Sequence, residues 1–248
     1  MGSKLTFERG RGLFVTGTNT GVGKTVVAGA IAKCLADGGQ QVGVFKPIAT
    51  GCKRRREGLV SGDAEFLAHC SDSLCPLEQI NPIRYQEPLA PSVAAERAED
   101  PIDWDALQLA YRNVVESSDL VVVEGIGGVM VPISNDYMVL DLMADMQLPV
   151  VIVASAELGT INHTLLTLKV CRERGLTVAG VVINSYQADG ASVAEETNPR
   201  VIAEIAKVTI LTVIPWDKNT CLEKGQLGSD ARAAAGQVNW AGLCGGRK

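Results

Sequence analysis

A glycine-rich segment that ends in Gly23, Lys24 and Thr25 follows a short apolar run and precedes a stretch of helix-forming residues. Where a strand leads through such a loop into a helix, the backbone N–H groups at the helix N-terminus can surround phosphate oxygens. Gly23 permits close approach, the Lys24 ammonium can contact the β- and γ-phosphates, and the Thr25 hydroxyl is placed for Mg²⁺. The segment predicts a nucleotide phosphate site.

Glu124 follows a second apolar run, residues 120–123, and precedes three residues that include two glycines. In open parallel sheets, ligands bind beyond the carboxyl ends of the strands, so this carboxylate would lie near the phosphate loop. There it could bind Mg²⁺ directly or through water. A solvated acid that begins a turn is the alternative, and the neighbouring phosphate loop favours the metal.

Lys46 ends a third apolar run and would emerge at the same edge of the sheet. A second lysine at this place could stabilise the charge that builds on a γ-phosphoryl group during its transfer. The alternative is a surface lysine whose stem lies along apolar side chains while its ammonium stays in water.

Two polar residues remain open on sequence grounds. Asp63 fits the N-cap of a following helix, and periodicity does not bring it to the phosphates. Asn184 closes an apolar run, and its amide carries the donor and acceptor that match the N6/N7 edge of adenine. A turn asparagine would fit Asn184 equally well.

These residues need a framework of alternating strands and helices. Apolar runs predict strands at residues 12–17, 41–46, 120–123, 148–154, 177–184 and 208–214. Helical patterns fall at residues 26–35, 64–70, 92–98, 104–117, 162–174 and 193–207. The alternation predicts βαβ units with right-handed crossovers. We therefore expect an α/β fold of the P-loop NTPase type, with a mostly parallel central sheet and helices on both faces.

We expect a single domain over residues 1–248, with its core at about 12–217 and a partly loose segment from Gly225 onward, which is rich in Gly and Ala. The chain is 46% hydrophobic but only 4% aromatic, so its core must be aliphatic, as in strands buried on both faces. A net charge of −5 argues against nucleic-acid binding. The basic cluster at residues 53–56 is expected to be a solvated loop.

No run of 18 apolar residues predicts a membrane span, and no apolar segment follows the first four residues as in a secretory signal. Seven scattered cysteines without a CxxC pair are typical of reduced thiols. These features predict a cytoplasmic protein without a membrane partner. With His69 and His163 as the only histidines, a His/Cys zinc site is not expected.

From Phe14 to about Trp216 the chain resembles the dethiobiotin synthetase family. The matching blocks are Val-Thr-Gly-Thr-Asn-Thr-Gly-Val-Gly-Lys-Thr, Lys-Pro-Ile-Ala-Thr-Gly, Gly-Asp-Ala, Val-Glu-Gly-Ile-Gly-Gly, Leu-Gly-Thr-Ile-Asn-His and Ile-Pro-Trp. A phosphate loop alone would be generic, whereas the blocks around Lys46 and Asn162 are specific. Family members often carry acidic residues where this chain has Asn19 and Gly21, a difference that bears on nucleotide preference.

The resemblance implies that Lys46 and Lys24 are catalytic and flank the transferring phosphoryl group. It implies that Mg²⁺ is bound by Thr25, Asp63 and Glu124. ATP would contact the phosphate-loop residues Gly21, Val22, Gly23, Lys24, Thr25 and Val26, the neighbouring Gly125, Ile126 and Gly127, and, around the adenine, Asn184, Ser185, Pro215, Trp216 and Asp217. Thr50 would contact the diamine or its carbamate.

The segment from Gly159 to Asn162 would hold the substrate carboxylate across a homodimer interface, at a helix N-terminus, where an anion is favoured. The implied reaction joins 7,8-diaminononanoate and CO2 into dethiobiotin through a carbamate and a carbamic–phosphoric mixed anhydride, with release of ADP and phosphate. Positioning and charge neutralisation suffice for such chemistry, so no protein nucleophile is needed. His163 would then pack or cap.

Two rival interpretations use the same fold. A ParA/MinD-like ATPase would switch partners with nucleotide and make no product, but such proteins usually carry a lysine early in the phosphate loop, where this chain has Thr18. They also often carry a basic DNA-binding patch or an amphipathic C-terminal helix, and neither is evident. A cobyrinate-type amidating ligase would need a glutaminase domain, for which 248 residues leave no room.

Overall fold

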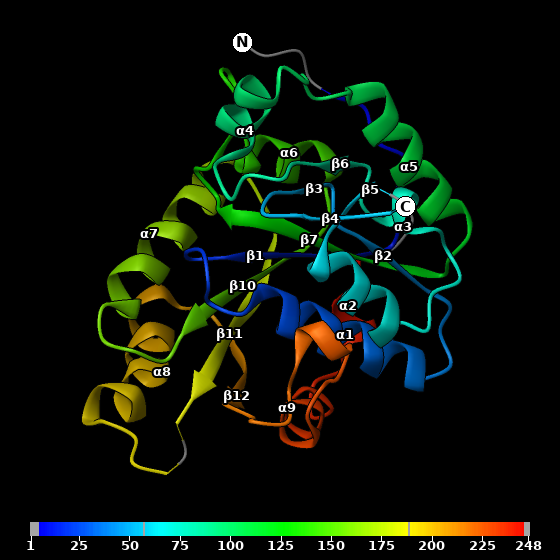
Figure 1. Ribbon diagram of the computed structural model, residues 1–248. Helices are drawn as coiled ribbons and strands as arrows, with labels where there is room; N and C mark the ends of the chain where they lie inside the picture. Colours follow the sequence, from blue (N-terminus) through cyan, green and yellow to red (C-terminus); the bar gives the residue numbers. More distant parts are fainter. Residues whose placement is uncertain (1–4, 57, 188, 246–248) are drawn as a thin grey trace.

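Six parallel strands form the central sheet of the protein (Figure 1), which we describe from a computed structural model of residues 5–56, 58–187 and 189–245. Their order is β12-β11-β10-β1-β7-β2. The bounds are Gly12–Gly17 for β1, Val42–Phe45 for β2, Leu120–Gly128 for β7, Val150–Ser155 for β10, Val178–Tyr186 for β11 and Ile210–Pro215 for β12. The predicted α/β fold with a mostly parallel sheet is confirmed.

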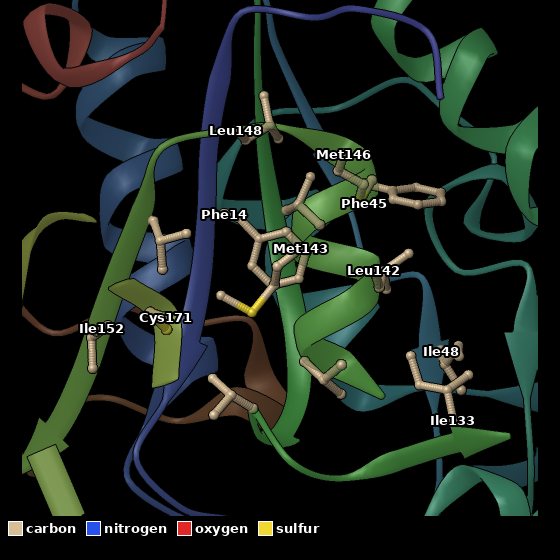
Figure 2. Packing of buried hydrophobic residues seen from close by; sticks show 14 of the residues in the cluster. Phe14, Phe45, Ile48, Ile133, Leu142, Met143, Met146, Leu148, Ile152 and Cys171 are labelled. Atoms are coloured by element: carbon tan, nitrogen blue, oxygen red, sulfur yellow. The ribbon is translucent and has the colours of Figure 1, made fainter. Parts of the chain in front are cut away.

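Helices cover both faces of this sheet because successive strand residues point to opposite sides. In β1, Leu13 and Val15 pack toward α1 (Lys24–Asp37), α9 (Ser229–Ala235) and α10 (Trp240–Leu243), whereas Phe14 packs into the other cluster. That second cluster includes side chains of α5 (Trp104–Glu116), α6 (Val139–Met146), α7 (Thr160–Glu173) and α8 (Val193–Ala206). Figure 2 shows Phe14 and Met143 of α6 within it. Most core residues are aliphatic, as the composition predicts, although Phe14, Phe45 and Tyr111 are fully buried among them.

Short elements between residues 48 and 98 connect the second strand to the third. The structure contains β3 (Ile48–Ala49), which pairs with β6 (Ile83–Arg84), and the helices α2 (Gly62–Cys70), α3 (Leu77–Ile80) and α4 (Pro91–Ala98). Beyond β7, a further small sheet joins β8 (Pro132–Ser134) to β9 (Tyr137–Met138). The sequence patterns predict α2 and α4, but the two-residue strands and α3 are too short for a periodic signal.

The prediction of a solvated loop at residues 53–56 is wrong for the backbone conformation, although the side chains are exposed as expected. Lys53–Arg55 form β4, which pairs antiparallel with β5 (Gly58–Val60). All three side chains of β4 are exposed, so no apolar alternation marks the strand. Lys53 forms an ion pair with Glu223 at 2.7 Å, which ties this hairpin to η1 (Leu222–Lys224).

The expectation of a loose C-terminal segment is also wrong over the described residues. Trp240 of α10 is 2% exposed, and its indole N–H donates to the carbonyl oxygen of Ala235 at 2.8 Å. The side chains of Ala231 and Trp240 join the apolar cluster around α1. Small residues in α9 give little hydrophobic signal in the sequence, although they let the helix approach its neighbours closely. No described helix is long and apolar enough to span a membrane.

Candidate functional site

The phosphate loop lies between β1 and α1, as predicted. Gly21 and Gly23 have φ values of 81° and 85°, a region that favours glycine, and Gly23 is the N-cap of α1. Thr18 N donates to the Val153 carbonyl at 2.9 Å, which anchors the start of the loop to β10. Within the described ranges no side chain caps the N-terminus of α1, so its first N–H groups are available to an anion.

Asn184 holds the loop from the end of β11. Its Nδ2 donates to the Val22 carbonyl at 3.0 Å and to Ser185 Oγ at 3.1 Å. A Cβ at Gly23 would lie 2.0 Å from this nitrogen, so the glycine is required by the asparagine as well as by the backbone angle. Asn184 is buried inside a strand and is therefore not a turn asparagine. Its predicted contact with adenine stays a prediction.

Lys46 and Glu124 form a buried ion pair at the carboxyl edge of the sheet. Lys46 Nζ donates to Glu124 Oε1 at 2.7 Å and to the Gly125 carbonyl at 3.1 Å, and it lies 2.9 Å from Asp63 Oδ2. The Lys46 and Glu124 side chains are 3% and 1% exposed. These burials exclude both the surface lysine and the solvated acid that the sequence left as alternatives.

Asp63 joins this cluster from α2. The N-cap of α2 is Ser61, whose Oγ accepts from Ala64 N at 3.4 Å, so the N-cap interpretation of Asp63 is wrong. Asp63 lies two positions after this N-cap, in the first turn, and its carboxylate contacts Lys46. Sequence periodicity could not predict this contact because it depends on how α2 packs against α1.

The electrostatic environment couples these charges. Burial lowers the pKa of Lys24 to about 8, against the opposing attraction of Glu124. Burial also lowers the pKa of Lys46, but Glu124 and Asp63 outweigh it and the net pKa is raised. The pKa of Glu124 is raised because burial outweighs Lys46, whereas Lys46 holds the pKa of Asp63 below its ordinary value despite burial. With all four groups ionised, the cluster is formally neutral.

The oxygen atoms of this cluster fit Mg²⁺. Thr25 Oγ1 donates to Glu124 Oε1 at 2.9 Å, while Glu124 Oε2 is buried and has no hydrogen-bond partner among the residues that the structure describes. Carboxylate and hydroxyl oxygens are the ligands that Mg²⁺ prefers, and it commonly keeps waters and phosphate oxygens as its remaining ligands. No group of three or more His, Cys, Asp or Glu residues suited to a metal occurs in the described ranges, so this protein would supply only part of the coordination shell.

A cavity of about 760 Å³ opens above the cluster. Its polar floor includes Lys24, Thr25, Lys46, Asp63 and Glu124. Predicted residues that also line it are Gly21, Gly23, Val26, Thr50, Ile126 and Gly127. The cavity also has an apolar wall that was not predicted from the sequence, and it is formed by Ala49, Pro88, Leu89, Ala90, Pro91, Val131 and Leu222. Pro88, in the loop before α4, and Pro91, its first residue, were the only sequence signal for this wall.

Several predicted residues lie outside this cavity lining. Val22, within the phosphate loop, is buried, and Gly125 contributes its carbonyl to Lys46. The others are Asn184, Ser185, Pro215, Trp216, Asp217, Gly159 and Asn162. Asp217 accepts from Asp230 N at 2.9 Å at the start of α9.

Trp216 is 57% exposed, and its backbone N–H donates to Tyr186 O at 2.9 Å. Gly159 is the N-cap of α7 and has no side-chain cap, and Asn162 is exposed one turn later. His163 is exposed too, which contradicts the expectation that it packs or caps.

Comparison with known proteins gives the family. The family described as AAA domain matches residues 11–223. The chain is 38% identical over 227 residues to the ATP-dependent dethiobiotin synthetase BioD of Thermodesulfovibrio yellowstonii, which covers 89% of this chain and 94% of that protein. It is 38% identical over 213 residues to the synthetase of the same name from Bacillus subtilis strain 168, at 86% and 90% coverage.

Solved structures with a similar fold have much lower identity. The cell division ATPase MinD of Pyrococcus furiosus superposes with a TM-score of 0.56 at 17% identity, over 94% of this chain and 97% of MinD. A ParA family ATPase from Chlorobium tepidum gives a TM-score of 0.57 at 15% identity, over 92% and 98%. These identities support a shared P-loop fold alone, whereas the 38% identity over nearly the whole length of the synthetases shows that the chain belongs to the dethiobiotin synthetase family.

Proposed function

We propose that the protein is an ATP-dependent ligase that closes a cyclic urea on 7,8-diaminononanoate with CO2 and so makes dethiobiotin. The observation that carries the proposal is the cavity, whose floor holds Lys24 and Lys46 side by side with two carboxylates and whose wall is apolar. Such a cavity suits a substrate that reacts with a triphosphate at one end and carries an alkyl chain. It fits the family to which the chain belongs.

The reaction balances without a protein nucleophile. One amine attacks CO2, loses a proton and becomes a carbamate. A carbamate oxygen then attacks the γ-phosphorus of ATP, the bond to the bridging oxygen breaks, and ADP leaves from a carbamic–phosphoric mixed anhydride. The second amine attacks the carbonyl carbon, loses a proton and expels phosphate as the ring closes. Among the described residues that line the cavity there is neither histidine nor cysteine.

The residues of the floor have distinct proposed roles. Backbone N–H groups of residues 21–26 and the Lys24 ammonium hold the β- and γ-phosphates. Lys46 neutralises charge on the γ-phosphoryl group as it transfers, and Thr50 contacts the diamine or its carbamate. Asn184, Ser185, Pro215, Trp216 and Asp217 are proposed to surround the adenine. Bound through Thr25, Asp63 and Glu124, Mg²⁺ would supply positive charge to the phosphates.

The test of this function is product formation. Purified protein mixed with ATP, Mg²⁺, bicarbonate and 7,8-diaminononanoate should yield dethiobiotin by mass spectrometry, with one ADP for each ring closed. A nucleotide-switch ATPase of the MinD or ParA kind would release ADP at the same rate with and without the diamine. Diamine-independent hydrolysis without dethiobiotin would therefore favour the switch and reject the ligase.

The metal ligands give a prediction of their own. Glu124→Gln keeps the shape of the side chain but removes the charge that faces the metal, so the Mg²⁺ concentration for half-maximal activity should rise at least about tenfold, the loss of about 1.4 kcal/mol of binding. Asp63→Asn should act in the same direction. Glu65→Gln, on the same helix as Asp63, provides the control. A Mg²⁺ titration that coincides with wild type would remove the mutated residue from the metal site.

The carboxylate of the substrate lies farther from the phosphates, and we propose that it binds the uncapped N-terminus of α7 around Gly159 and Asn162 of a second subunit. The exposed Leu158 and Leu166 flank this segment and suit a covered face. We predict a homodimer at catalytic concentrations, measured by light scattering coupled to size exclusion. A monomeric mass under conditions of full activity would contradict the shared site.

A further inference from the structure

Lys46 is the first residue after β2, so the strand pairing of the central sheet does not hold its main chain in place. β2 ends at Phe45, and Pro47 has no N–H to donate to a neighbouring strand. Pairing resumes only at Ile48, which pairs with Ile83 in the small sheet of β3 and β6. The main chain therefore changes sheets at the residue that carries the buried ammonium.

The last residue of α3, Ile80, and the residue after it, Asn81, hydrogen-bond to the main-chain N–H and carbonyl of Lys46. Lys46 N donates to the Ile80 carbonyl at 2.7 Å. The Lys46 carbonyl accepts from Nδ2 of Asn81 at 2.7 Å, and the same nitrogen donates to the Ile83 carbonyl at 3.2 Å. One side-chain amide thus joins the end of β2 to the start of β6.

The two carbonyl acceptors determine which way the Asn81 amide is oriented. Asn81 is 1% exposed, so water does not replace its partners. If the amide were turned over, its oxygen would lie against two carbonyl oxygens, and no donor would face Lys46. As placed, Oδ1 is buried and has no hydrogen-bond partner in the described part of the chain, so the amide acts through its N–H groups.

We propose that Asn81 is a positioning residue for Lys46. It does not line the cavity and so acts through the main chain of Lys46, which sets where Nζ lies between Glu124, Asp63 and the phosphoryl group. The proposal rests on the proposed function in one respect, namely that Lys46 stabilises the transferring group. The claim that Asn81 restrains Lys46 depends only on the hydrogen bonds described above.

Steady-state kinetics of three variants separate positioning from packing. Because a displacement of about 1 Å in a reacting group can cost about 10²-fold in rate, we expect the loss of one restraint in Asn81→Ala to lower kcat about tenfold. KM for ATP should change less than about twofold, since the phosphate loop is untouched. Asn81→Asp, although equal in shape, should be worse than alanine because it places oxygen against two carbonyls. Asn81→Ser keeps a small donor and should lie between alanine and wild type.

A control and a second readout keep the test independent of folding and of the assigned reaction. Asn198 is a buried asparagine whose Nδ2 donates to the carbonyls of Ala156 and Glu157 at 2.9 and 3.2 Å, so Asn198→Ala removes an equivalent amide elsewhere. Pulse acetylation with acetic anhydride, read by mass spectrometry, should modify Lys46 several times faster in Asn81→Ala and Asn81→Ser than in wild type or Asn198→Ala. Thermal melting and ATP calorimetry identify any variant that has not folded.

The outcomes are distinct. Wild-type kcat and wild-type acetylation of Lys46 in folded Asn81→Ala or Asn81→Ser would overturn the proposal, as would an Asn81→Asp variant as active as wild type. If wild type formed no dethiobiotin, the proposed function would fail, and the acetylation rates would still decide whether Asn81 restrains Lys46.

Discussion

Lys46→Ala should lower the rate of dethiobiotin formation by about 10²–10³-fold, or about 2.7–4 kcal/mol, the usual cost of removing one transition-state charge partner from a water-poor site. ATP affinity should stay near normal, because Lys24 and the backbone of the phosphate loop remain. Removing a cation from between Glu124 and Asp63 should also leave Mg²⁺ binding at least as tight as in wild type. A lower kcat with intact binding of both ligands is the signature of an interaction that strengthens during phosphoryl transfer.

The measurement combines single-turnover ring closure with calorimetry of ATP and Mg²⁺. Lys53→Ala is a suitable control because Lys53 is 71% exposed and its ion pair with Glu223 lies at the surface. Exposed pairs of this kind contribute little, so its rate should match wild type. Full ring-closing activity in Lys46→Ala would remove the residue from the catalytic role, and a parallel loss of ATP affinity would reassign it to ground-state binding.

Lys24→Ala should instead lose ATP affinity. The ammonium lies at the start of α1 and lines the cavity floor, where a charge-assisted contact to phosphate contributes about 1.5–3 kcal/mol, or about 10–150-fold in Kd. AMP, which lacks the β- and γ-phosphates, should show a much smaller difference between wild type and variant. Calorimetry with both nucleotides measures the two effects on one protein sample.

Lys33 offers a matched control on the same helix. It is half-buried and pairs with Asp37 at 3.1 Å and Asp72 at 3.2 Å, far along α1 from the loop. Lys33→Ala should therefore bind ATP as wild type does. Equal ATP affinity in Lys24→Ala and Lys33→Ala would show that the phosphates bind elsewhere.

The sequence predicted those parts of the protein that follow from local pattern. Aliphatic runs gave the six main strands, because strands buried on both faces need continuous apolar residues. Lys46 and Glu124 follow two of these apolar runs, so they could be placed together because parallel strands end at one edge. The contact between them in the structure follows from this topology. The expectation that the strand ends at Glu124 is wrong, since β7 continues to Gly128.

Other features depend on packing between distant segments and leave no local trace. Asp63 reaches Lys46 because α2 packs against α1 and β2, and its local sequence resembles an ordinary helix start. The sequence around Asn81 predicts only a loop residue, and the two carbonyls that its amide contacts are known only from the structure. The apolar wall at Pro88 and Leu222 joins segments more than a hundred residues apart. Such contacts come from tertiary structure, which periodicity does not describe.

The strand order has a consequence for the protein as it is being synthesised. β1 lies between β10 and β7, and β2 pairs only with β7, so neither of the first two strands of the central sheet has the other as a neighbour. Both emerge from the ribosome before residue 120, where their first shared partner begins. The nascent chain thus carries two apolar strands that have no native partner in that sheet until β7 follows. Long-range parallel pairing of this kind is slow and exposes strand edges to aggregation, so a chaperone that shields β1 and β2 should raise the yield of folded protein.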